Sequence, residues 1–128
     1  MKIEHIGFQV AAPAAMADWY IANLNFSCRR SADEPVPVRF IADSGGKVML
    51  EIYNNPKVEV PDYSQIDPLT LHFAYTCDDI PGTVDKLVKA GAVLISGPEM
   101  IPSGDQLAML RDPWGLVIQL CHRKNPMV

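Results

Sequence analysis

The chain has 128 residues, of which 48% are hydrophobic and 20% are charged, and this predicts one domain with a packed core. A net charge of −4 without a basic cluster argues against nucleic acids and anionic membranes as main partners. No apolar run approaches the ~20 residues of a membrane span, and the opening residues lack the apolar core of a secretory signal. Three separated cysteines, Cys28, Cys77 and Cys121, fit reduced thiols in a cytoplasmic protein.

The first half of the chain predicts one helix and four strands. Apolar residues at helical spacing follow Pro13, which suits a helix start. "SGGK" is typical of a hairpin turn. In chain order we predict a strand at residues 2–10, a helix from Pro13, short strands near 26–30 and 36–42, and a strand over "VMLEIYN".

The second half repeats this order after a polar, proline-bearing linker. "LTLHFAYTC" predicts a strand, and "DDIPGTVDKLVKAGA" predicts a helix with aspartate at its start and glycine at its end. "VLIS", "LAMLRD" and "LVIQLCH" predict three more strands. The loop "SGPEMIPSGD" between the first two of these has the glycine and proline content of a lid.

The two halves align when one is shifted by 67 or 68 positions. The shift by 67 places His5 on His72, and the shift by 68 places Glu51 on Gln119. Identity is low, but the order and spacing of the elements agree. We therefore predict an α+β fold in one domain, residues 1–128, with a βαβββ module at 1–54, a linker at 55–68 and a second module at 69–128.

Four polar side chains occupy equivalent places in this repeat. Side chains alternate between the faces of a strand, and in four strands the phase opposite the more apolar one carries a single His5, Glu51, His72 or Gln119. Each residue alone is more often hydrogen-bonded or solvated than a ligand. If the modules are related by pseudo-symmetry, the four converge, and imidazole with oxygen donors suits divalent zinc, nickel, cobalt, manganese or iron.

Three segments carry a family resemblance. "IEHIGFQV", "LHFAYTCDDIPGTVDKLVKAGA" and "LRDPWGLVIQL" resemble recurring segments of the vicinal oxygen chelate superfamily, which includes glyoxalase I, extradiol dioxygenases and bleomycin-resistance proteins. The resemblance covers essentially the whole chain. It implies two βαβββ modules that form an open, curved mixed sheet around a cavity. The implied metal ligands, on the first and last strands of each module, map to His5, Glu51, His72 and Gln119.

The last of these positions departs from the family pattern. Glyoxalase-I-like members usually carry glutamate there, whereas this chain has Gln119 in "DPWGLVIQL". An amide oxygen can bind a metal, but it is neutral and cannot act as a base. The substitution therefore lowers the expected metal affinity and leaves Glu51 as the only carboxylate among the four.

The resemblance implies a glyoxalase-I-like (lactoylglutathione-lyase-like) lyase or isomerase as the leading function. Its divalent metal would stabilise an enolate, and Glu51 would move a proton alpha to a carbonyl of a hemithioacetal or another α-oxo compound; a metal-bound hydroxide is the other candidate base. Gln119 disfavours an extradiol dioxygenase and a fosfomycin-type transferase. The alternative from another class is a metal-free small-molecule-binding or drug-sequestering protein of the bleomycin-resistance type.

Little in the sequence encodes the substrate. Arginines in the third strand of each module are able to reach an anionic substrate, although solvated surface arginines are commoner, and a tryptophan after the "DP" turn either covers the cavity or caps the hairpin. Family members commonly form homodimers, and this implies a homodimer here. The candidate substrate-binding residues are Arg39, Tyr53, Arg111 and Trp114.

Overall fold

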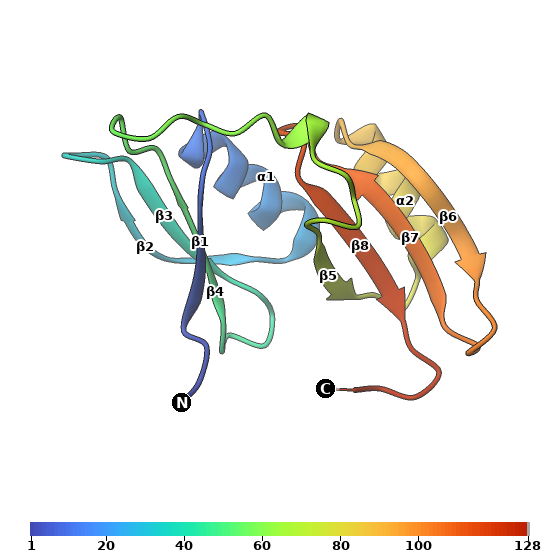
Figure 1. Ribbon diagram of the computed structural model, residues 1–128. Coiled ribbons are helices and arrows are strands. Elements are labelled where there is room, and N and C mark those ends of the chain that lie inside the picture. The colour runs from blue at the N-terminus through green and yellow to red at the C-terminus, as the bar shows by residue number, and fades with distance from the viewer. Residues whose placement is uncertain (128) are drawn as a thin grey trace. The chain divides into compact units, whose positions relative to one another are not determined.

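The computed structural model describes residues 1–127 and divides the chain into two compact units, Met1–Pro61 and Asp62–Val128. Each unit contains one open four-stranded mixed sheet and one α-helix in the order β-α-β-β-β (Figure 1). This confirms the predicted α+β fold of two βαβββ modules. Within residues 1–127, no helix combines the length and the apolar character that a membrane span needs.

The sheet of the first unit has the strand order β1-β4-β3-β2. Strands β1 and β4 are parallel neighbours, whereas β4–β3 and β3–β2 pair antiparallel. The first and last strands of the module therefore lie side by side, so residues far apart in the sequence become neighbours. The elements are β1 (His5–Gln9), α1 (Pro13–Leu24), β2 (Ser27–Ala32), β3 (Val38–Ala42) and β4 (Met49–Tyr53).

The second unit repeats this topology with the order β5-β8-β7-β6. Strands β5 and β8 are parallel, and the other neighbouring pairs are antiparallel. A 3₁₀ turn precedes the sheet, within the segment that the sequence predicts as a linker. The elements are η1 (Tyr63–Gln65), β5 (Phe73–Thr76), α2 (Ile80–Lys89), β6 (Val93–Met100), β7 (Gln106–Arg111) and β8 (Val117–His122).

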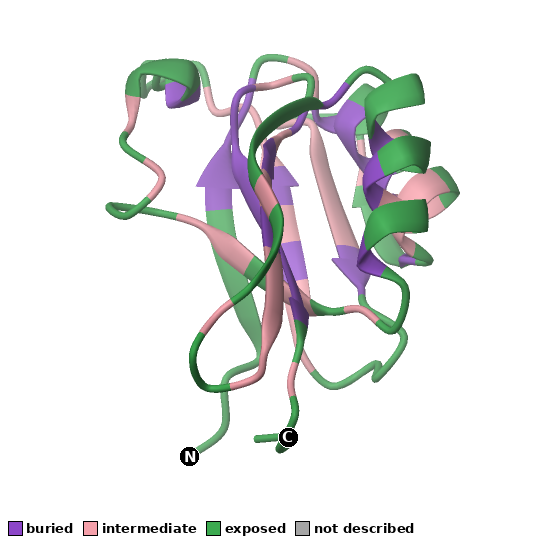
Figure 2. Cartoon of the chain, turned by 90° about the vertical axis from the view of Figure 1, so that its right-hand side faces the viewer, coloured by how far each residue is buried: buried purple, intermediate pink, exposed green. Residues whose placement is uncertain are grey.

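One helix packs on one face of each sheet and forms the core of that unit. Helix α1 contacts β2, β3 and β4, and α2 contacts β6, β7 and β8. The side of α2 that faces the strands is buried and its outer side is exposed (Figure 2). In the first unit Met16 and Tyr20 of α1 are fully buried with Ile41 and Ile52 of the sheet. The opposite face of each sheet is therefore not covered by the helix of its own unit.

The predicted lid loop is wrong in part. The sequence predicts a loop over 96–105, but strand β6 continues through Met100 and pairs with β7. Backbone pairing overrides the glycine and proline signals, because the register shifts around Ser96–Glu99 accommodate the extra residues as an irregularity. Only the short turn at Ile101–Asp105 lies outside the strands.

Candidate functional site

Strands β1 and β4 bring a histidine and a carboxylate together in the first unit. The parallel register pairs Gly7 with Glu51 and His5 with Met49, so His5 and Glu51 share one face of the sheet, as the alternation of the sequence predicts. Nε2 of His5 lies 3.3 Å from Oε2 of Glu51. Both side chains are partly exposed, at 37% and 27%. The pair is thus reachable from solvent on the face away from α1.

The other ring nitrogen of His5 is also engaged. Nδ1 lies 2.5 Å from Oε2 of Glu4, the residue directly before β1. The ring also packs edge-on against Phe40, with centroids 5.6 Å apart and an interplanar angle of 89°. Both ring nitrogens of His5 therefore lie beside a carboxylate oxygen, Nδ1 beside Glu4 and Nε2 beside Glu51. Glu4 and Phe40 therefore orient the imidazole so that Nε2 is turned toward Glu51.

Gly7 provides the space that this pair needs. A β-carbon at Gly7 would stand 2.8 Å from Oε2 of Glu51 and 3.5 Å from Cε1 of Tyr53. The missing side chain lets the Glu51 carboxylate lie across β1. A glycine is therefore needed at position 7 to accommodate the Glu51 side chain, and not to form a turn.

A hollow opens beside Glu51 in the first unit. Its volume is about 390 Å³. Tyr53, a candidate substrate-binding residue, stands two residues after Glu51 on the same face of β4 and lines this hollow. A carboxylate set in a partly apolar wall suits a small ligand with both polar and apolar groups. The lining residues are Val36, Val38, Glu51, Tyr53 and Asn55.

The second unit holds the other predicted ligands, His72 and Gln119. His72 directly precedes β5, and its Nδ1 lies 2.9 Å from the carbonyl oxygen of Pro68. Because a carbonyl oxygen only accepts, Nδ1–H of His72 is the donor in this contact. Gln119 pairs with Ala74 in the parallel register, whereas His72 stands one residue before the strand and is not placed by strand alternation.

The thiol of Cys121 contacts the Gln119 amide. Its Sγ donates to Oε1 of Gln119 at 3.3 Å. Burial raises the pKa of the Cys121 thiol. Cys121 also lines a hollow of about 290 Å³ where the chain leaves β5 and β8. Because Oε1 has two lone pairs, the contact leaves one of them for another partner.

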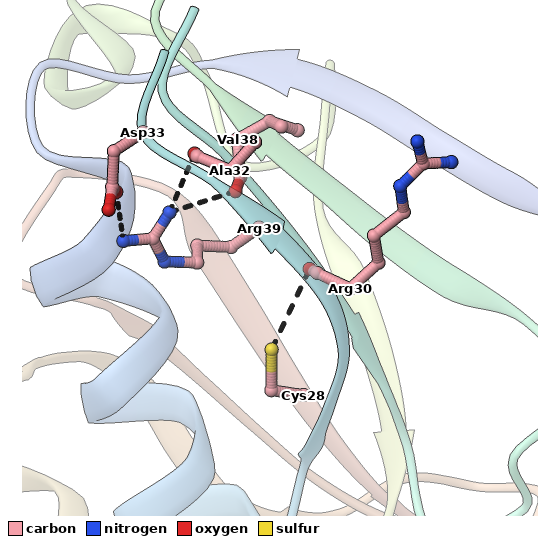
Figure 3. A network of polar contacts seen from close by, with 6 residues as sticks. All are labelled: Cys28, Arg30, Ala32, Asp33, Val38 and Arg39. Atoms are coloured by element: carbon pink, nitrogen blue, oxygen red, sulfur yellow. Dashed lines mark hydrogen bonds and ion pairs between the residues drawn. The ribbon is translucent and has the colours of Figure 1, made fainter.

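Arg39 lies on the other face of the first sheet. Its register partner in β4 is Ile52, a fully buried core residue, so Arg39 is on the face opposite Glu51. Its guanidinium donates to the carbonyl oxygens of Ala32 and Val38, both at 2.9 Å, and to Asp33 Oδ1 at 2.6 Å (Figure 3). The structure therefore separates this candidate substrate residue from the His5–Glu51 pair and uses it to join β2 and β3.

Arg111 also binds backbone of its own unit. Nη1 donates to the carbonyl oxygens of Tyr63 and Gly115 at 2.9 and 2.8 Å, and Nη2 donates to that of Ile66 at 2.7 Å. A β-carbon at Gly115 would stand 2.6 Å from the amide nitrogen of Ser64. The side chain of Arg111 thus links the η1 segment to the β7–β8 turn through hydrogen bonds.

Trp114 lies half-buried in the β7–β8 turn. The buried carboxylate of Asp112 accepts hydrogen bonds from the backbone N–H groups of Trp114 at 2.9 Å and Leu116 at 3.0 Å. This network fixes the turn that the sequence "DPWG" predicts. Asp112 therefore determines where the Trp114 backbone lies.

The donor atoms fit a divalent metal in part. Two ligands at about 2.0–2.2 Å from a zinc-type ion and about 100° apart lie about 3.2 Å from each other, close to the 3.3 Å between His5 Nε2 and Glu51 Oε2. Over residues 1–127, no three or more His, Cys, Asp or Glu side chains gather in a group that would hold a metal. The pair therefore supplies two suitable ligands, and a metal needs further donors such as amide oxygens or water.

Strand alternation in the sequence does not indicate that Glu4 and Gly7 lie next to the His5–Glu51 pair. Glu4 and His5 are adjacent, and strand alternation assigns adjacent side chains to opposite faces. Glu4 precedes the strand, so this rule does not apply to it. Gly7 offers no side chain to notice, and its role follows only from the position of Glu51.

Solved structures with the same fold come from proteins of different activities. An antibiotic binding protein from Streptomyces sp. CB03234 is 20% identical, with a TM-score of 0.71, 94% of this chain and 93% of that chain covered. A glyoxalase/bleomycin resistance protein/dioxygenase family enzyme from Burkholderia phytofirmans PsJN is 19% identical, with a TM-score of 0.76 and coverage of 94% and 98%.

A glyoxalase I mutant from Zea mays is similar over part of its length. It is 20% identical with a TM-score of 0.75, and the match covers 97% of this chain but 46% of that one. No curated protein sequence matches the chain significantly. The model of the Glyoxalase/Bleomycin resistance protein/Dioxygenase superfamily matches residues 2–120. The chain belongs to this superfamily.

Proposed function

We propose that the protein is a metal-dependent lyase or isomerase of the glyoxalase I type, with His5, Glu51, His72 and Gln119 as metal ligands. The observation that carries the proposal is the 3.3 Å separation of His5 Nε2 and Glu51 Oε2. The Nδ1 atoms of His5 and His72 both contact oxygen acceptors, so each imidazole offers Nε2. This arrangement is typical of metal-binding histidines.

The proposed chemistry is a proton transfer next to a carbonyl group. A divalent metal, when bound, supplies a Lewis acid for the negative charge that develops on a substrate oxygen. The Glu51 carboxylate accepts the proton from the carbon alpha to the carbonyl and delivers it to the neighbouring carbon. The hollow beside Glu51 and Tyr53 receives the substrate. We propose a hemithioacetal or another small α-oxo compound as the substrate class.

A second candidate is a metal-free protein that binds small molecules. The hollow in the first unit supports it, because Val36, Val38 and Tyr53 provide apolar and aromatic wall. The antibiotic binding protein of the same fold also supports it. In this case His5 and Glu51 hydrogen-bond the ligand, and neither needs a metal.

Metal analysis followed by an isomerisation assay separates the two candidates. Protein is reconstituted with nickel, zinc, cobalt, manganese or iron, desalted, analysed for metal and tested with a hemithioacetal. We expect close to one metal per chain and turnover that ethylenediaminetetraacetate abolishes. Glu51→Gln should remove turnover. If the protein retains none of the five metals, the proposal of a metal-dependent enzyme is contradicted.

We further propose a homodimer in the cytoplasm. Cys28, Cys77 and Cys121 are all free thiols, which suits a reducing compartment. Size-exclusion chromatography with light scattering at micromolar concentration should give twice the 14.1 kDa mass of the chain. A mass of one chain contradicts the dimer.

A further inference from the structure

Gln9 is a buried polar residue on the face of β1 that carries His5. Only 5% of its surface is exposed, and its register partner in β4 is Tyr53, which lines the hollow beside Glu51. We propose that Gln9 is a positioning residue, which fixes Asn55 at the wall of this hollow so that the Asn55 amide binds an acceptor oxygen of the ligand. The inference rests on the proposed function, in which the hollow receives the substrate.

The side-chain amide of Gln9 binds the backbone of a turn that follows β4. Its Oε1 accepts a hydrogen bond from the N–H of Asn55 at 3.0 Å, and its Nε2 donates to the carbonyl oxygen of the same residue at 3.0 Å. Nε2 also donates to the carbonyl oxygen of Val58. A hydrogen bond from the N–H of Val58 to the carbonyl oxygen of Asn55, at 3.1 Å, closes the turn. Because its amide is both donor and acceptor, Gln9 holds both ends of this turn.

Asn55 lies two residues beyond the end of β4, so strand pairing does not by itself determine its position. The residue before it is still held by the sheet, because the N–H of Asn54 donates to the carbonyl oxygen of Pro37 at 3.0 Å and its side chain donates to that of Val10 at 2.9 Å. The N–H and the carbonyl oxygen of Asn55 instead both bind the Gln9 side chain. Without the Gln9 amide, Asn55 therefore loses the contacts of both backbone groups to β1.

The Asn55 side chain supplies a hydrogen-bond donor to the wall of the hollow. Its Oδ1 accepts from the backbone N–H of Lys57 at 3.0 Å, which leaves the two N–H groups of Nδ2 for a ligand. Glu51, Tyr53 and Asn55 follow one another in two-residue steps, and all three line the hollow. A carboxylate that only accepts and an amide that donates therefore stand at the two ends of this row. The hollow suits a ligand with a carbonyl or carboxylate oxygen at the end away from Glu51.

Two variants and their combination test whether Gln9 acts through Asn55. Gln9→Met keeps an unbranched side chain of similar length but removes the amide donor and acceptor, and Asn55→Ala removes the Nδ2 donor. Gln65→Met is the matched control, because Gln65 is an exposed glutamine of the second unit. Hydrogen exchange of the Asn55 backbone amide is measured by ¹H–¹⁵N NMR. KM and kcat are measured on the metal-reconstituted protein with the hemithioacetal of glutathione and methylglyoxal.

Gln9→Met should speed exchange of the Asn55 amide about 10-fold, because that N–H loses its acceptor. The amide of Cys77, which donates to the carbonyl oxygen of Cys121 at 2.9 Å in the second unit, should exchange as in the wild type. KM should rise about 5-fold in Gln9→Met and in Asn55→Ala, as for one lost hydrogen bond, while kcat stays within about 2-fold. The double variant should match the single variants, because Gln9 acts through Asn55. Gln65→Met should match the wild type in every measurement.

A wild-type exchange rate of the Asn55 amide in Gln9→Met overturns the inference. A lower kcat with an unchanged KM also overturns it, because that result indicates a purely structural role. KM increases that multiply in the double variant show that Gln9 and Asn55 act independently, and this too contradicts the inference. Failure of the proposed function looks different: the wild-type protein itself then turns over no hemithioacetal. The ligand-binding role of Asn55 falls with that function, while the exchange rate still tests its contact with Gln9.

Discussion

Oε2 of Glu51 occupies the space that a side chain at Gly7 would fill, 2.8 Å from the position of its missing β-carbon. Gly7→Ala should therefore push the Glu51 carboxylate away from His5. The fold should survive, because the displaced atom is the end of a flexible side chain. We expect about 10-fold weaker zinc binding by calorimetry. The substitution displaces the Glu51 carboxylate without removing it, and the effect should therefore resemble the loss of a contact that orients a metal ligand.

The matched control is Gly45→Ala, which also lacks a positive φ but lies in the β3–β4 turn. Urea unfolding should show a change of less than about 1 kcal/mol for Gly7→Ala, because alanine is no worse than glycine in a strand. Zinc binding as tight as in the wild type would show that Glu51 does not need the space above Gly7.

Gln119→Glu should tighten metal binding. The substitution adds one negative charge at a proposed ligand and keeps an oxygen that accepts from Cys121. We expect at least a 10-fold increase in zinc affinity by calorimetry. Gln106→Glu is the control, since Gln106 pairs with His122 on the opposite phase of the sheet from Gln119. Equal zinc affinity in Gln119→Glu and the wild type would remove residue 119 from the ligand set.

Arg111→Lys should destabilise the second unit. A lysine ammonium cannot reach the carbonyl oxygens of Tyr63, Ile66 and Gly115 together, because its donors share one point. We expect the free energy of unfolding to fall by about 2 kcal/mol in urea titrations, as for lost hydrogen bonds to a charged group. Arg30→Lys, at an exposed position of β2, is the control. Unchanged stability together with weaker ligand binding would return Arg111 to the substrate-binding role.

Asp105 should contribute to acid unfolding. The Arg123 guanidinium, 2.9 Å from Oδ2, and the backbone N–H of Lys124 lower the pKa of Asp105 in the folded protein. Folding is therefore stabilised above the unfolded-state pKa of ~3.9, and this stabilisation is lost as the pH falls through the lower folded pKa. Asp105→Asn should flatten the acid limb of stability against pH in urea unfolding. Asp18→Asn, on the exposed side of α1, should retain the wild-type slope.

The topology of each unit could be predicted because local sequence patterns indicate it. Alternation and helical spacing identify the strands and helices, and the repeat in the chain matches the repeat of the two modules. The pattern also placed His5 and Glu51 on one face, and the parallel register of β1 and β4 agrees. The loop over 96–105 failed as a prediction, because pairing with β7 outweighs local glycine and proline signals.

The hydrogen-bond partners of Arg39 and Arg111 could not be predicted from sequence patterns. Arg39 and Arg111 lie in the third strands of their modules as predicted. Both guanidinium groups donate to backbone carbonyl oxygens of other segments and of near neighbours, and Arg39 also donates to the Asp33 carboxylate. A sequence identifies a guanidinium as an anion binder, but only the folded chain shows that carbonyl groups already use its donors.

The sequence by itself determined the module repeat, the shared phase of His5 and Glu51 and the neutral character of Gln119, because these depend on residue type and spacing. Tertiary structure alone decided the contacts that make His5 and Glu51 a pair. Glu4 reaches Nδ1 at 2.5 Å, Glu51 stands 3.3 Å from Nε2, and Gly7 leaves room for that carboxylate. These depend on distances between side chains on paired strands, and register and rotamers set such distances only once the chain has folded.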